Sequence, residues 1–240
     1  MELKKNNFTS KEHGFTLIEI LITMAITGIV SAAIFTSLQS QQKSYVVQES
    51  VAAMQQNLRA GMDIMVREIR MAGFDSTRDA DAGIVSATSI SINFTMDVGN
   101  GIDDDSDGKT DETDEFMVDG DTNDPNENIT YSLYTSDGIQ KLGRKNPSLN
   151  RPVSENIDAL EFYYTLADGT QVPIPSGSVP DPTLIRSVQI TLLARVDRTD
   201  QKFVNTRTYT TPGGQTWGPY NDNFRRRLLT TTVKCRNMGL

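Results

Sequence analysis

The residues with the clearest capacity for chemistry are the carboxylates of one acidic segment, residues 100–115. Its aspartates alternate along the chain and are followed by Gly108. A tight turn at such a glycine folds alternate carboxylates onto one centre, as in calcium-binding loops. The spacing therefore predicts a structural calcium site. Its ligands would be Asp103, Asp105, Asp107, Lys109, Asp111 and Asp114. They take positions one, three, five, seven, nine and twelve of the loop template in that order, and Lys109 would bind through its backbone carbonyl.

The last of these predicted ligands departs from the template, because a bidentate Glu is usual at position twelve and Asp114 has a shorter side chain. Glu112 or Glu115 would substitute if Asp114 did not span two coordination positions. Asp119 and Asp121, with Asn123 and Asp124, are weaker candidates for a second site, since they lack the glycine at the turn position of the template. The expected Kd is weak, on the order of 10⁻⁴ to 10⁻³ M. The alternative interpretation is a solvated acidic linker that binds no metal.

A second unusual residue is Glu19, the one charge in an apolar run from Phe15 to Leu38. The run is long enough to cross a bilayer, which needs about 20 apolar residues. The leader from Met1 to Gly14 is mildly basic, so we expect it to stay in the cytoplasm while the rest is exported. A carboxylate inside a membrane helix costs about 2 kcal/mol or more and is usually paired. The nearest candidate cation is a new amino terminus at Phe15, released by cleavage after Gly14.

Two simpler interpretations of the same run compete with this one. The first is a secretory signal peptide with Val30-Ser31-Ala32 as a small-residue cleavage site. The second is a plain signal anchor. Both leave Glu19 without a role.

The segment Gly14-Phe15-Thr16-Leu17-Ile18-Glu19 resembles the processing motif of type IV prepilins and type II secretion pseudopilins. The resemblance implies cleavage between Gly14 and Phe15 by a prepilin peptidase, followed by N-methylation of Phe15. It also implies that the Glu19 carboxylate meets the amino terminus of a neighbouring subunit during assembly. Both charges are costly alone in lipid, so their pairing favours the addition of subunits in one register.

A long helix must position these residues. No proline occurs before Pro125, and apolar residues continue at helical spacing after the membrane run. We expect one helix from about Phe15 to Ala72, roughly 87 Å long at 1.5 Å per residue, with Gly73 as its stop. The apolar stripe of its second half consists of Val47, Val51, Met54, Leu58, Met62, Met65 and Ile69.

Beyond Gly73 the pattern changes to strands separated by Gly and Pro clusters. The separations are too short for crossover helices, so the sheet should be mainly antiparallel and the fold class α+β. The predicted strands span Ile84 to Val98, Ile129 to Tyr134, Ile157 to Leu166, Leu184 to Val196, Phe203 to Thr210 and Arg225 to Cys235.

Several of these later segments resemble PilW or J-type minor pilins, which implies a pilin fold. They run in the same order along most of the chain: 67–74 (Arg-Glu-Ile-Arg-Met-Ala-Gly-Phe), 156–164, 185–190 and 225–234. Such proteins are thought to sit at or near a filament tip and to help initiate assembly.

Composition excludes several classes of function. The single histidine, His13, lies in the leader, so the mature chain has no histidine for catalysis or metal binding. The single cysteine, Cys235, excludes an intrachain disulfide, and we expect it half-buried in a late strand. A net charge of −8 makes a nucleic-acid partner improbable. The sequence has no phosphate loop, nucleophile elbow or zinc spacing, so we expect no enzyme.

The sequence therefore predicts a minor pilin of the PilW type that helps initiate a type IV pilus or cap its tip. Its partners would be other pilin subunits, the prepilin peptidase, the inner-membrane assembly platform and membrane lipid. A J-type pseudopilin of type II secretion is the alternative, and a calcium-dependent tip adhesin is an alternative of another class. We expect a single-pass inner-membrane protein with a periplasmic C-terminus that later enters a pilus or pseudopilus. The predicted parts are a leader (1–14), a membrane and filament-core helix (15–38), its amphipathic continuation (39–73) and a β-rich globular domain (74–240).

Overall fold

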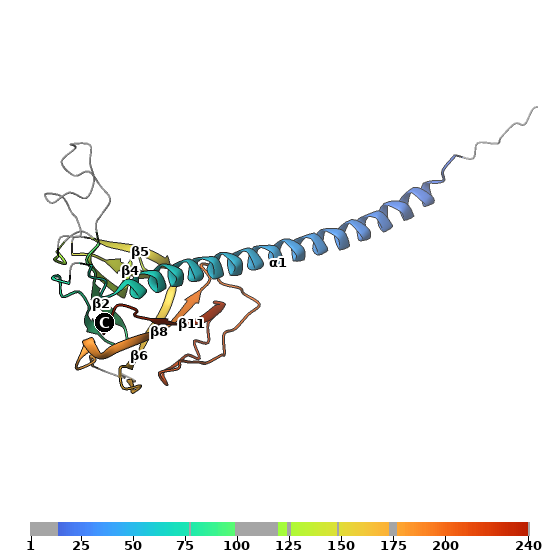
Figure 1. Cartoon of the computed structure of the whole chain (residues 1–240). Helices are drawn as coiled ribbons and strands as arrows, with labels where there is room; N and C mark the ends of the chain where they lie inside the picture. The colour runs from blue at the N-terminus through green and yellow to red at the C-terminus, as the bar shows by residue number, and fades with distance from the viewer. Residues whose placement is uncertain are drawn as a thin grey trace, which may run out of the picture. The chain divides into compact units, whose positions relative to one another are not determined.

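The structure, a computed structural model, describes residues 14–76, 78–98, 120–123, 126–147, 149–172 and 177–239. One long helix, α1 (Leu17–Met71), precedes the strands (Figure 1). A five-stranded antiparallel sheet contains, in spatial order, β1 (Ile84–Ala87), β2 (Ser91–Thr95), β3 (Asn128–Ser136), β4 (Ile139–Lys145) and β5 (Asn150–Glu155). The predicted α+β class with mainly antiparallel strands is confirmed.

A second antiparallel sheet has four strands in the order β11-β8-β6-β7. Its members are β6 (Ile157–Leu166), β7 (Gln171–Val172), β8 (Ile185–Arg195) and β11 (Arg226–Lys234). A short 3-10 helix, η1 (Pro182–Leu184), precedes β8. The two-residue strands β9 (Tyr209–Thr210) and β10 (Thr216–Trp217) pair in the long connection between β8 and β11.

The chain divides into two compact units, Met1–Gln48 and Glu49–Leu240, and α1 contributes to both. In the second unit the helix buries the stripe predicted from its spacing, including Leu58, Met65 and Ile69. These side chains join strand residues of both sheets in one core. Gly61 lies in the stripe where α1 approaches β5, and a Cβ there would be 2.9 Å from the Cβ of Ser154.

The helix ends as the sequence predicts. Gly73 adopts a left-handed backbone with φ +76°, which costs glycine little and other residues more. Its N–H donates to the carbonyl of Thr95 over 3.0 Å, which attaches the end of α1 to the end of β2.

Some strand predictions were wrong. The segment from Ile84 to Val98 is a hairpin rather than one strand, because Thr88 and Ser91 form a hydrogen-bonded turn within it. In the segment from Phe203 to Thr210, only the two residues of β9 are in a strand. The hairpin of β4 and β5 was not predicted. By contrast, the predictions for β6, β8 and β11 lie within one residue of the observed bounds.

Candidate functional site

The predicted processing site directly precedes the helix. Gly14 and Phe15 are both exposed, and the Phe15 side chain is 86% exposed. A Cβ added to Gly14 would meet no atom within 4 Å. The peptide bond between these two residues is therefore open to an enzyme in the described part of the chain.

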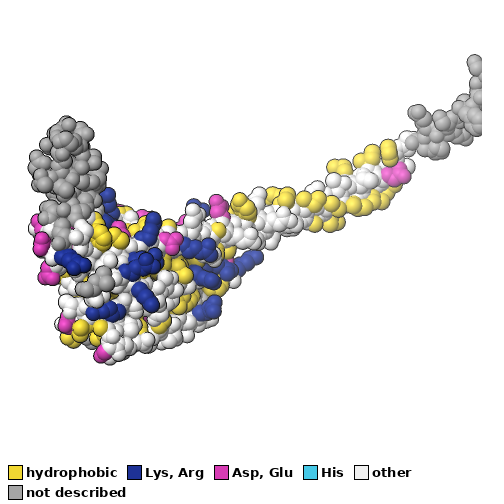
Figure 2. All heavy atoms as spheres, viewed as in Figure 1, with side chains coloured by type: hydrophobic (Ala, Val, Ile, Leu, Met, Phe, Trp, Pro, Cys, Tyr) yellow, Lys and Arg dark blue, Asp and Glu magenta, His cyan; other side chains and the backbone are white. Residues whose placement is uncertain are grey.

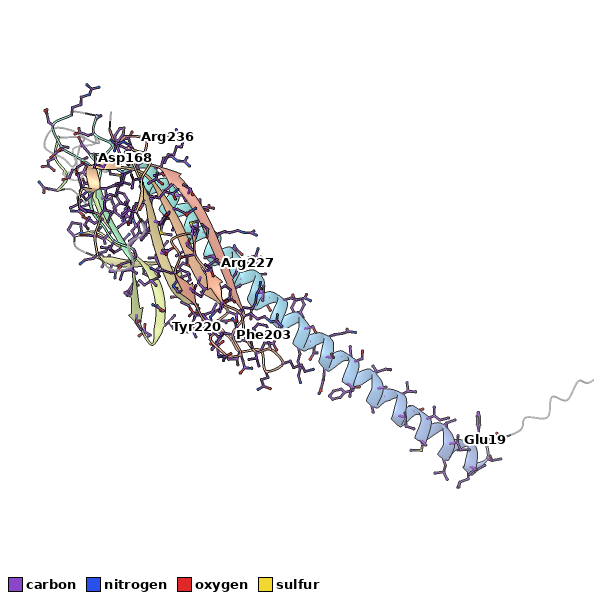
Figure 3. All side chains as sticks on the ribbon, turned by 90° about the horizontal axis from the view of Figure 1, so that it is seen from below. Glu19, Asp168, Phe203, Tyr220, Arg227 and Arg236 are labelled. Carbon is purple, nitrogen blue, oxygen red and sulfur yellow. The ribbon has the colours of Figure 1, made fainter. Side chains whose placement is uncertain are left out.

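Thr16 and Glu19 form a capping box at the start of α1. The Thr16 backbone N–H and hydroxyl each donate to Oε2 of Glu19 over 2.8 Å. In return, the Glu19 backbone N–H donates to the Thr16 hydroxyl over 3.3 Å. Such reciprocal bonds satisfy helix N–H groups that have no partner within the helix. The carboxylate is therefore held at the first turn, next to the residue that cleavage would make the amino terminus (Figure 3).

Every described residue from Gly14 to Val46 is exposed, although most of the first part of this segment is apolar. Figure 2 shows apolar side chains along this part of the helix. By length and composition α1 is the one helix in the described chain that qualifies to span a membrane. Two of its hydroxyls are satisfied locally, since the Thr23 hydroxyl donates to the carbonyl of Ile20 and the Thr36 hydroxyl to that of Ala33. Such bonds lower the cost of placing hydroxyls in lipid.

A polar cluster attaches the second part of α1 to the five-stranded sheet. The buried Tyr131 hydroxyl donates to Glu68 of the helix, and Arg144 donates to both oxygens of the same carboxylate over 2.9 and 3.0 Å. Burial, and then the negative charge of Glu68, raise the pKa of Tyr131 well above its ordinary value. The sequence offered no sign of this cluster, because the partners of Glu68 lie more than 60 residues away along the chain.

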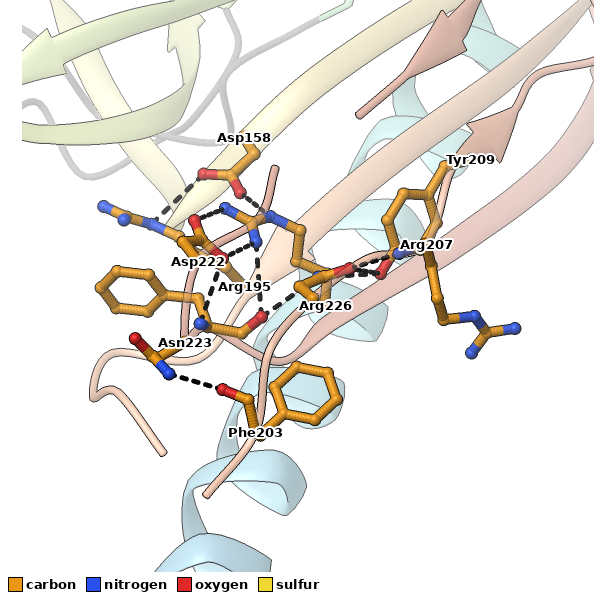
Figure 4. A network of polar contacts seen from close by, with 10 residues as sticks. Asp158, Arg195, Phe203, Arg207, Tyr209, Asp222, Asn223 and Arg226 are labelled. Atoms are coloured by element: carbon orange, nitrogen blue, oxygen red, sulfur yellow. Dashed lines mark hydrogen bonds and ion pairs between the residues drawn. The ribbon is translucent and has the colours of Figure 1, made fainter. Parts of the chain in front are cut away.

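A larger network orders the connection before β11 (Figure 4). Its centre is Arg226, whose side chain is 3% exposed. The guanidinium donates to both oxygens of Asp222 over 2.6 and 2.7 Å and to Asp158 of β6 over 2.5 Å. Its central carbon also lies 3.7 Å from the ring centroid of Tyr220. Arg195 of β8 approaches the second oxygen of Asp158 at 3.2 Å. The bonds from Arg226 lower the pKa of Asp222.

Glu161 holds the hairpin of β9 and β10 against the outer face of the four-stranded sheet. Its side chain is buried and accepts hydrogen bonds from the Thr211 hydroxyl over 2.8 Å and the Gly213 N–H over 3.3 Å. A Cβ at Gly213 would lie 2.6 Å from this carboxylate, so glycine is required for the approach. Glu161 belongs to the segment 156–164 that resembles PilW proteins, and its environment assigns it an anchoring role.

The predicted calcium loop, residues 100–115, lies outside the described residues, as does Asp119. Asp121 is described, and its carboxylate accepts a hydrogen bond from the Asn123 N–H over 2.8 Å. The chain on either side of the loop is joined, because the Val98 N–H donates to Glu127 over 2.8 Å. No group of three or more potential metal-binding side chains occurs among the described residues.

The lone cysteine, Cys235, is buried just beyond β11. Burial raises the pKa of its thiol to about 12, so it is protonated at neutral pH. Because the thiolate is the reactive form, this environment suits a core residue better than a reactive one.

Comparisons with known proteins agree with the helix and its motif. Residues 9–35 match the family described as the prokaryotic N-terminal methylation motif, and residues 130–237 match the type IV pilus-assembly protein W family. No curated protein matches the chain significantly. Among solved structures, a type IV-like pilin from Thermus thermophilus is similar at 16% identity and a TM-score of 0.45, with 77% of this chain and 98% of that chain covered.

The methylation motif covers the end of the predicted leader and the first part of α1. The second match begins within β3 and runs to the end of β11, including the hairpin that Glu161 anchors. These matches include the prepilin motif at 14–19 and three of the four segments that resembled PilW proteins, whereas the segment 67–74 lies outside both. The chain therefore combines a prokaryotic N-terminal methylation motif with a C-terminal region similar to the type IV pilus-assembly protein W family.

Proposed function

We propose that this protein is a structural subunit that enters a type IV pilus, where it helps initiate assembly or cap the tip. The observation that supports this most directly is the carboxylate of Glu19, held at the first turn of an exposed apolar helix that begins at Leu17, three residues after Gly14. A helix that is apolar on all sides requires lipid or other apolar helices around it. The role is one of anchoring and packing rather than catalysis.

Processing would create the partner for that carboxylate. Hydrolysis of the peptide bond between Gly14 and Phe15 by a prepilin peptidase leaves an amino group on Phe15, which is then N-methylated. This cation and the Glu19 carboxylate each need a partner in lipid. Pairing between subunits satisfies both, while α1 passes from the inner membrane, through the assembly platform, to the filament core.

The experiment is mass spectrometry of the amino terminus of the membrane-extracted chain, from cells with and without the prepilin peptidase. We expect a chain that begins at N-methylated Phe15 only when the peptidase is present. A chain that begins after Ala32, or that retains Met1 in both strains, would refute the proposal. A Gly14→Val variant serves as the uncleaved control, since a branched side chain would occupy the open space beside the bond.

We also propose that the acidic segment binds calcium as a structural ion. Nine Asp and Glu residues and one Lys fall within residues 99–119, so this segment has a net charge of −8 and the rest of the chain is neutral overall. Such a density of charge repels itself without a cation. We expect millimolar Ca²⁺ to raise the thermal unfolding temperature of the full chain in detergent, and Asp105→Asn with Asp107→Asn to abolish the rise. An equal rise with Mg²⁺, or none with either ion, would contradict the assignment.

A further inference from the structure

The two larger sheets have four edges, and three of them are built in ways that discourage pairing with another strand. β7 is two residues long. β5 contains Pro152 and a shift in register, and β1 has only four residues and also a shift. Short strands, bulges and proline are the usual protections of a sheet edge.

The fourth edge, β11, has none of these protections. It is nine residues long, contains no proline and pairs with β8 through nine consecutive positions without a shift. Its central residues from Leu228 to Val233 are Leu, Leu, Thr, Thr, Thr and Val, which favour extended structure and are uncharged.

The direction of its backbone groups follows from the bonds that flank the strand. The Val196 N–H donates to the carbonyl of Arg225, and the Cys235 N–H donates to that of Arg186, both over 3.0 Å. Arg225 and Cys235, the residues that flank β11, thus direct their backbone groups toward β8. Because hydrogen bonding alternates along an antiparallel pair, the other odd-numbered residues of β11 do the same. The outward-facing N–H and C=O groups therefore belong to Arg226, Leu228, Thr230, Thr232 and Lys234. Among the described residues, no hydrogen bond is made to these outward groups.

Cations stand at both ends of this edge. Figure 3 shows Arg227 at one end and Arg236 at the other. Lys234 is the last residue of β11, and all three side chains are exposed. Unlike Arg225 and Arg226, these three form no ion pair with a carboxylate among the described residues. The edge therefore presents an uncharged middle with a positive charge at each end.

We propose that the outer edge of β11 takes up an extended strand of a neighbouring pilin-type subunit, one with an uncharged middle and acidic ends. Only a polypeptide backbone matches alternating N–H and C=O groups along an edge, which favours a strand over another anionic partner. The proposal rests on the proposed function, because it requires neighbouring subunits. It adds a second contact that is independent of the helix start.

The test uses the full chain in intact cells with the photo-crosslinker p-benzoylphenylalanine. Thr232→p-benzoylphenylalanine places it on β11, and Gln171→p-benzoylphenylalanine places it on β7, the opposite edge of the same sheet. We expect position 232 to give an adduct with a chain that carries its own N-terminal methylation motif, at least tenfold above position 171. Equal yields at both positions, or an adduct only with nucleic acid or lipid, would overturn the proposal.

A matched pair of variants then tests the backbone itself. Thr230→Pro removes one outward N–H without removing a backbone bond to β8, and it also removes the hydroxyl that bonds the Thr191 hydroxyl of β8 over 3.1 Å. Thr230→Val removes the same hydroxyl and keeps the N–H. We expect proline to lower the adduct yield at position 232 at least tenfold and valine to leave it unchanged. Arg227→Glu with Lys234→Glu, which leaves the backbone intact, should lower the yield several-fold even if the proline variant folds poorly.

Two outcomes would refute the edge contact alone. The first is a full adduct yield from both the charge-reversed chain and a folded Thr230→Pro chain. The second is no adduct at position 232 from a chain that is processed and present in filaments. A chain that is neither processed at Phe15 nor found in filaments would refute the proposed function as well.

Discussion

Between Leu17 and Val46, α1 is exposed on every side, whereas between Glu49 and Met71 the same helix buries one stripe and leaves its charged residues outside it. The second part finds its apolar partners within its own chain, in the core that it shares with both sheets. The first part has no such partner among the described residues, so its apolar surface must be covered by lipid or by other subunits. Substitutions in the two parts should therefore act on different measurements: assembly for the first and unfolding for the second.

The largest effect expected in the first part is that of Glu19→Gln. The amide oxygen can still accept hydrogen bonds from Thr16, so the capping box is retained while the charge is lost. Incorporation into filaments should fall at least about tenfold, since 1.4 kcal/mol of lost interaction lowers an equilibrium constant tenfold. Immunoblots of sheared filaments measure it. Thr23→Val, which removes a hydroxyl from the same run, should incorporate normally; full incorporation of the Glu19 variant would show that its charge is not used.

The largest effect expected in the second part is that of Met65→Ala. Met65 is 0% exposed, and its truncation should lower the free energy of unfolding by about 2 to 5 kcal/mol because it leaves a cavity. Ile26→Ala is the control from the first part, where the side chain is 56% exposed. Thermal unfolding of both variants in detergent should show a loss only for Met65. An equal loss for Ile26 would mean that the two parts of the helix do not differ in this way.

A smaller effect should follow from removing the polar attachment of α1. Tyr131→Phe deletes the hydroxyl that donates to Glu68 and should cost about 1 to 2 kcal/mol, with Arg144 still bound to the carboxylate. Chemical denaturation of the two chains measures the difference. Tyr134→Phe removes a neighbouring hydroxyl from the same strand and should change stability little, so similar losses in both variants would argue against a special role for Tyr131.

The same contact predicts a modest pH dependence. The pKa of Tyr131 is raised in the folded state, so the unfolded chain loses this proton first as the pH rises above about 10. The contribution of Tyr131 is therefore complete below that pH and is lost progressively above it. The stability difference between wild type and Tyr131→Phe should shrink between pH 9 and 11. A constant difference across that range would contradict the assignment.

The sequence was sufficient for those elements whose pattern is local. The buried stripe of α1, its stop at Gly73 and the strands β6, β8 and β11 follow from apolar spacing and from one glycine. The hairpin of β4 and β5 was missed because Leu142 is the only apolar core residue of β4, among Lys, Gln and Arg. The turn that leads into β4, Asp137-Gly138 between β3 and β4, has positive φ at both residues and was a usable signal for a strand after it.

The candidate site likewise contains contacts between residues close in the sequence, which could be predicted, and contacts between distant residues, which could not. The capping box of Thr16 and Glu19 follows from a spacing of three residues and was open to prediction. The attachment of Glu68 to Tyr131, and that of Arg226 to Asp158, join residues more than 60 positions apart. Such pairs depend on the register of strands that the sequence alone does not specify. The predicted calcium ligands at 103–114 remain a prediction, since they lie outside the described residues.

The junction between β2 and β3 has a consequence for how this family of sequences can diversify. Residues 96–127 connect two adjacent strands whose ends are already joined, by the bond from Met96 N–H to the Glu127 carbonyl and that from Val98 N–H to the Glu127 side chain. Closing a loop on such a base becomes only slightly harder as it lengthens, by about 0.6 kcal/mol for each doubling. Insertions, deletions or epitope tags in this connection should therefore leave the strand register intact, which makes it a suitable position for carrying foreign peptides on this protein.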